Sequence, residues 1–197
     1  MKKTLAILAT TLSILPVVAH AFPIASTGEG LNVLVGGTDP IVAKYEGNSA
    51  AYSNDLYLML DGMGNPGDDG NLSNDSFIFN NHSSAVGSTV NLGSFAIGTE
   101  LIFRLHVNDT GYDFFTGAAS RNPDDHAHAR VQENWAPTTT LVSFEDLYNG
   151  PFDFNDLSFS FTNTVTTRPP EPGVPEPASL ALLGIGLVGL RALRRKA

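Results

Sequence analysis

Apolar and polar residues alternate along several short stretches of the chain, a pattern typical of β-strands with one buried face. In Glu100–Val107 one face carries Arg104 and His106, and the other carries four apolar residues: Leu101, Phe103, Leu105 and Val107. Shorter stretches of strand character are Leu31–Val35, Asp55–Leu60, Ser76–Phe79, Ala127–Val131 and Thr138–Phe144. No stretch between them keeps a helical period. The pattern predicts an all-β domain, an antiparallel β-sandwich or jelly roll.

The second clear alternation lies in Asp156–Asn163, where Leu157, Phe159 and Phe161 share one face. We therefore expect Phe103, from the first alternating stretch, and Phe159 to lie in the core. Gly- and Asp-rich clusters such as Asp61–Gly70 separate the strands and favour turns.

Both ends of the chain differ from this body. At the N-terminus, Lys2 and Lys3 precede the apolar stretch Leu5–Val18, and Ala19-His20-Ala21 fits a signal peptidase site. We expect residues 1–21 to be a signal peptide and signal peptidase to leave Phe22 as the first residue. The folded domain should then span 22–163. Five prolines in Thr164–Pro177 predict a semi-rigid linker after it.

The C-terminal segment 174–197 combines three features in a fixed order. The first is a Pro-Glu-Pro element, made of Val174, Pro175, Glu176 and Pro177. The second is an uncharged apolar run, Leu180–Leu190, and the third is a cationic cluster of Arg191, Arg194, Arg195 and Lys196. The prolines keep the backbone extended and open to a processing enzyme. The apolar run is short for a bilayer, so we expect it to hold the protein in the membrane only transiently.

This segment closely resembles the PEP-CTERM sorting signal of exopolysaccharide-producing Gram-negative bacteria. The resemblance implies cleavage by the membrane enzyme exosortase at the Pro-Glu-Pro element. It implies an intermediate tethered to the inner membrane, then release to the cell surface or the extracellular matrix, with exopolysaccharide as a candidate partner. An ordinary C-terminal anchor is the alternative interpretation.

Charge narrows the classes of partner. All 20 acidic residues lie between Phe22 and Pro177, against only five basic ones, so this segment has a formal charge of −15. Such a body repels nucleic acid and attracts cations. The chain has no cysteine, which excludes disulfides, thiol catalysis and cysteine-based metal sites.

The densest group of chemically active residues lies in Phe144–Leu157. Oxygen-bearing side chains surround a Gly-Pro turn there: Glu145, Asp146, Asp153, Asn155 and Asp156. Ca²⁺ takes six to eight oxygen ligands, and a bound ion would relieve the repulsion between the carboxylates. From the spacing alone, an ion site and a solvated acidic loop both remain open.

The sequence also allows two other kinds of site. Glu145 or Asp146 could pair with Asp153 or Asp156 as the acid and base of a glycosidase acting on polysaccharide. His126 and His128 would share one face of a strand and could bind a transition metal, or could line a solvent-facing strand edge.

The body also resembles a bacterial family known as domain of unknown function 4114, found in exported and surface proteins. The resemblance covers roughly Asn54–Asn163, and its motifs are Asn122-Pro-Asp124, His126–Val131, Phe144–Leu147 and Asp153–Leu157. Tyr148–Phe152 departs from the family, because it has one glycine and fewer charges than usual. The resemblance implies no particular reaction.

The sequence thus favours an exported structural or binding module, stabilised by Ca²⁺, over an enzyme. No residue is assigned a catalytic role. The alternatives are a secreted polysaccharide hydrolase that uses the acidic group, and a carbohydrate-binding adhesin.

Overall fold

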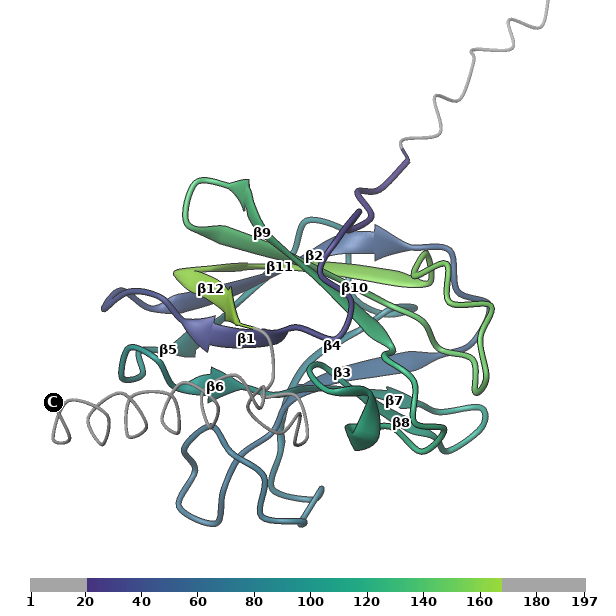
Figure 1. Ribbon diagram of the computed structural model, residues 1–197, viewed down its shortest axis with the longest axis horizontal. Helices are drawn as coiled ribbons and strands as arrows, with labels where there is room; N and C mark the ends of the chain where they lie inside the picture. Colours follow the sequence, from purple (N-terminus) through teal and green to yellow (C-terminus); the bar gives the residue numbers. More distant parts are fainter. Residues whose placement is uncertain (1–20, 168–197) are drawn as a thin grey trace, which may run out of the picture.

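The structure, a computed structural model, describes residues 21–167, which form an all-β domain (Figure 1). The strands are β1 (Asn32–Val35), β2 (Ile41–Asn48), β3 (Asn54–Leu58), β4 (Ser76–Asn80), β5 (Thr89–Gly93), β6 (Glu100–Leu101), β7 (Phe103–Val107), β8 (Asp113–Phe115), β9 (Ala129–Ala136), β10 (Thr139–Phe144), β11 (Leu157–Thr162) and β12 (Thr164–Thr167). A 3-10 helix, η1 (Ala119–Arg121), lies between β8 and β9. The predicted fold class is confirmed.

The strands form three antiparallel sheets. The five-stranded sheet has the order β5-β2-β11-β10-β9, the four-stranded sheet β4-β3-β7-β8, and the three-stranded sheet β12-β1-β6. At two points the chain passes from one sheet to another with a single residue between the strands. Ile102 separates β6 from β7, and Asn163 separates β11 from β12. Asn163 has a φ of 55°, a left-handed conformation that asparagine tolerates, so the chain turns a corner there.

Aromatic side chains join the two larger sheets across the core. The rings of Phe103 from β7 and Phe161 from β11 stack with centroids 3.9 Å apart, and those of Phe79 and Phe159 stack at 6.0 Å. All four residues are buried. The predicted inward orientation of Phe103 and Phe159 is therefore confirmed, as is the alternation on which it depended.

Some residues predicted to face solvent are covered. Arg104 points away from the core, yet it is buried because the loop before β4 folds over it, and its Nε donates to Asp75 Oδ2 at 2.8 Å. In the five-stranded sheet, Ser143 and Ser158 hydrogen-bond to each other at 2.7 Å. The N-terminal segment lies across them, since the backbone N–H of Ala25 donates to Ser143 Oγ.

The sheets also extend beyond the predicted strands. Thr164–Thr167, placed at the start of the linker, form β12 instead, because this β-branched run pairs along the whole of β1. β9 begins two residues later than expected and continues to Ala136. Strands β2, β5 and β8 were not predicted. Within residues 21–167 no helix is long and apolar enough to cross a membrane.

Candidate cation site

The candidate site lies where β10 ends and β11 begins. These strands are antiparallel neighbours, and Phe144, the last residue of β10, pairs with Leu157, the first of β11. The residues just beyond that pair must therefore lie side by side. The backbone N–H of Asp146 accordingly donates to Asp156 Oδ2 at 2.9 Å, although ten positions separate them.

Three of the five predicted ligands converge at this point. Glu145, Asp146 and Asp156 each offer a carboxylate oxygen, and these three oxygens lie within 4.8 Å of one another. Glu145 is only 1% exposed and Asp146 only 3%. The result is a buried concentration of like charge, which we call the carboxylate cluster.

A fourth polar side chain reaches the cluster from the opposite sheet. Asn54, at the start of β3, is fully buried, and its Nδ2 donates to Asp146 Oδ2 at 2.8 Å. Its backbone N–H donates to Asn81 Oδ1, which holds this end of the strand in place. The cluster therefore touches both large sheets.

Two oxygen atoms at the cluster have no hydrogen-bond partner. Glu145 Oε1 accepts a 3.2 Å bond from the N–H of Leu147, but Oε2 is buried and unpaired. The Oδ1 atom of Asn54 is also buried without a partner. Unpaired buried oxygens are costly, so each one calls for an explanation such as an ion or a water molecule.

The electrostatics of the cluster favour protonation when no cation is bound. Burial, followed by the charge of Asp156, raises the pKa of Glu145 from 4.5 to about 7. Burial also raises the pKa of Asp146 from 3.8 to about 6, against the opposing effect of the Asn54 hydrogen bond. Near neutral pH the cluster therefore needs either protons or a cation.

The other two predicted ligands lie outside the converging group. Asp153 is exposed, and its Oδ1 accepts a long 3.4 Å bond from the N–H of Asn155. Asn155 Oδ1 instead accepts a bond from Ser49 Oγ at 2.9 Å. Asp153 still contributes a weak repulsion to Glu145.

His128 supports the site but does not resemble a metal ligand. The ring is completely buried: Nε2 lies 2.9 Å from Asp124 Oδ2, and Nδ1 lies 3.0 Å from the backbone oxygen of Glu145. Asp124 Oδ2 also accepts the N–H of Asn149. These bonds fix the loop that carries the cluster. His126 is exposed, so the two histidines do not share a face as expected. Burial by itself would raise the pKa of Asp124. Its hydrogen bonds, first of all the one with His128, outweigh that effect, so the pKa is lowered.

The loop between β10 and β11 is held in an unusual backbone conformation. Asn149, Phe152 and Phe154 have φ values of 62°, 59° and 58°. This region is unfavourable for phenylalanine and persists only where packing imposes it. Phe154 is fully buried, and the guanidinium of Arg130 lies 4.1 Å from its ring centre.

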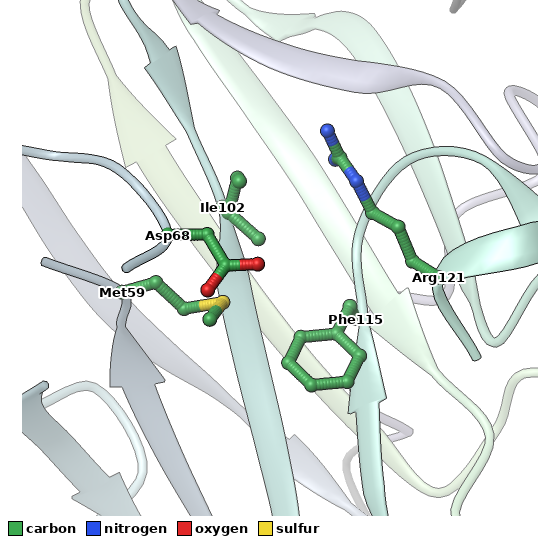
Figure 2. A pocket seen from close by; sticks show the side chains of 5 residues that line it. All are labelled: Met59, Asp68, Ile102, Phe115 and Arg121. Carbon is green, nitrogen blue, oxygen red and sulfur yellow. The ribbon is translucent and has the colours of Figure 1, made fainter. Parts of the chain in front are cut away.

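The chemistry of the cluster suits an ion better than a polymer substrate. Glu145 and Asp146 are shielded from solvent, so a sugar chain cannot reach their carboxyl groups. A separate pocket of about 110 Å³ is lined by Met59, Asp68, Ile102, Phe115 and Arg121 (Figure 2). It has room for a few water molecules, and its Arg121 already binds both Glu100 oxygens.

Sequence reasoning missed Asn54 and Asp124. Asn54 carried a usable signal, because in β3 it occupies the same inward-facing phase as Leu56 and Leu58, where a polar residue needs a partner. Asp124 belongs to the Asn122–Asp124 motif, but its contact with His128 gave no separate signal in the sequence.

Comparison with known proteins identifies the tail. Residues 173–196 match the family model described as the PEP-CTERM protein-sorting motif, which confirms the predicted sorting signal. No curated protein and no solved structure matches the chain. The matched residues, like residues 1–20 of the predicted signal peptide 1–21, lie outside the described part of the structure. The motif implies an exported protein that is processed at the membrane and recognised by exosortase.

Proposed function

We propose that this protein is a cell-surface or extracellular-matrix module whose β-domain is stabilised by a calcium ion at the carboxylate cluster. The observation that carries the proposal is the buried Glu145 Oε2, which has no hydrogen-bond partner and belongs to three converging carboxylates. The unpaired Oδ1 of Asn54 would add a neutral oxygen, and water molecules would supply the remaining ligands. Carboxylate and amide oxygens are the ligands that calcium prefers.

The position of the cluster supports a structural role. An ion bound to Asp146 and Asn54 would link the five-stranded sheet to the four-stranded sheet at one end of the core. The chain has no cysteine, so no disulfide can supply such a link outside the cell. Binding to the folded state alone would stabilise it by about 2.7 kcal/mol at 100 times the dissociation constant.

The resemblance of Asn54–Asn163 to domain of unknown function 4114 belongs to this proposal. It is supported by the motifs quoted above, two of which, Phe144–Leu147 and Asp153–Leu157, contain the cluster.

The proposal also includes two cleavages of the chain, by signal peptidase before Phe22 and by exosortase near Pro175–Pro177. Intact-mass measurement of secreted protein tests both cleavages, and a product that still ends at Ala197 would contradict the second.

Calorimetric titration with Ca²⁺ tests the ion site. We expect one site per chain in the wild-type protein and no measurable binding in Asp156→Asn, which removes one charge but keeps the shape of the side chain. Asp39→Asn, an exposed change elsewhere, serves as the control and should bind normally. If the wild type binds no Ca²⁺ but hydrolyses a polysaccharide in a reaction that Asp156→Asn abolishes, the hydrolase hypothesis replaces this proposal.

A further inference from the structure

Beside the carboxylate cluster, six aromatic rings lie in unbroken succession. Adjacent ring centres are separated by 4.9, 6.1, 3.7, 5.4 and 4.9 Å. In order of contact the rings are Tyr148, Tyr112, Phe114, His128, Phe152 and His126, and we call them the aromatic row. Three segments far apart in sequence contribute: the β7–β8 hairpin, the segment before β9 and the loop between β10 and β11.

The row is fixed in its middle and open at its ends. Phe114 and His128 are fully buried and stack nearly parallel, at 10°. At one end Tyr112 is 40% exposed and Tyr148 41%, and at the other the His126 side chain is 54% exposed. Tyr112 packs on the buried Phe114, Tyr148 stacks on Tyr112, and His126 stacks on the half-buried Phe152. Because these contacts already restrict the exposed rings, binding a ligand would cost little side-chain entropy.

Both exposed ends carry negative charge. Asp109 lies on the same hairpin turn as Tyr112, Asp125 precedes His126, and Asp153 follows Phe152; all three are exposed. No basic side chain balances them, since each lysine and arginine among residues 21–167 pairs with another acidic residue: Lys44 with Glu46, Arg104 with Asp75 and Asp113, Arg121 with Glu100, and Arg130 with Glu29. The surface therefore attracts cations and repels anionic polymers.

We propose that the aromatic row binds a polysaccharide that carries free amino groups. Tyrosine faces pack against the C–H face of a sugar ring, while their hydroxyls bond to its hydroxyls. An ammonium group is attracted both by an aromatic face and by the flanking carboxylates. This activity goes beyond the calcium site and does not depend on it.

Binding of the full chain, in mild detergent, to soluble chitosan oligosaccharides tests the proposal. The wild type should bind them and should not bind the fully N-acetylated oligosaccharides. Tyr112→Ala and Tyr148→Ala should each weaken binding about tenfold, and Asp109→Asn should weaken it less. Phe77→Ala removes an exposed aromatic outside the row and should leave binding unchanged. Every variant is checked for an unaltered calcium response, which separates this test from that of the ion site.

Three outcomes would overturn the proposal. Equal binding of the acetylated oligosaccharides would show that the amino group is not recognised. Unchanged binding in both tyrosine variants would reduce the interaction to the general negative charge of the body. Binding of poly-lysine with the same affinity and the same tyrosine dependence would make a cationic peptide the partner.

Discussion

Two acidic loops of this protein look alike in sequence and differ in structure. The loop Asp61–Asp75 is exposed for most of its length, and two of its carboxylates are satisfied locally: Asp61 Oδ1 accepts the N–H groups of Met63 and Asn65, and Asp69 accepts the N–H of Asn71. These hydrogen bonds lower the pKa of Asp61. The last carboxylate of the loop, Asp75, instead pairs with Arg104. In Glu145–Asp156 the paired strands bring three carboxylates together, those of Glu145, Asp146 and Asp156. Glu145 and Asp146 are buried, and their pKa values rise.

The comparison shows that a high density of acidic residues does not by itself make an ion site. Exposed carboxylates bond to water and to nearby N–H groups, so they have no need of a cation. Buried carboxylates that converge must share protons or bind a cation, because their repulsion is poorly screened. The pairing of Phe144 with Leu157 decides which case applies here.

The largest effect should come from the core that supports both loops. Phe159→Ala should lower the free energy of unfolding by about 3–5 kcal/mol, since it leaves a cavity beneath Tyr45, Phe79 and Phe144. Urea titration measures the loss. The decrease should be equal with and without Ca²⁺, which separates core packing from the ion site. A loss below about 1 kcal/mol would mean that the core tolerates the cavity.

The stability that the two loops contribute should depend on pH in opposite directions. Glu145 and Asp146 have raised pKa values in the folded state, so their contribution is complete below pH 4 and is lost as pH rises through about 6 to 7. Without Ca²⁺, the fragment Phe22–Thr167 should lose on the order of 2 kcal/mol between pH 5 and pH 8. Asp61 has a lowered pKa in the folded state, so it stabilises the fold at pH values above the ordinary pKa of an aspartate. That contribution is lost as the pH falls through the lowered pKa.

Denaturant unfolding at the two pH values checks this in the presence of a chelator. Added Ca²⁺ should remove most of the difference, because the ion replaces the protons. Glu145→Gln should flatten the profile even without the ion. Stability that rises from pH 5 to pH 8 in the chelator would contradict the account of the cluster.

The smallest effect should follow from substitution in the exposed loop. Asp69→Asn keeps an oxygen that can accept the N–H of Asn71. The free energy of unfolding should therefore change by less than about 0.5 kcal/mol. Calcium binding should also be unchanged. Thermal melting of this variant beside Asp156→Asn makes the comparison directly, and a loss of the calcium response in Asp69→Asn would move the site to the other loop.

The sequence predicted the parts of the fold in which one face is strictly apolar. Glu100–Val107 and Asp156–Asn163 were found for that reason. β2 was missed although Ile41, Ala43 and Tyr45 alternate with the polar Lys44 and Glu46. Gly47 takes the next inward position, and a glycine there weakens the strand pattern. β12 was hidden by the prolines that follow it in the predicted linker.

The candidate site was predictable only in its local part. Glu145, Asp146 and Asp156 stand on either side of one turn, so their proximity follows from two neighbouring strands. Asn54 contacts Asp146 across 92 positions, a distance that strand alternation cannot bridge without the sheet order. The same holds for the aromatic row, whose rings come from three segments that the fold alone brings together.

The central claim is that Ca²⁺ stabilises this domain through the buried carboxylates, and one measurement tests it most directly. The melting temperature of Phe22–Thr167 is followed as Ca²⁺ is added, for the wild type, Asp156→Asn and Asp69→Asn. The account predicts a rise in the wild type and in Asp69→Asn, and none in Asp156→Asn. A wild-type melting temperature that does not respond to Ca²⁺, or an equal rise in all three proteins, would contradict it.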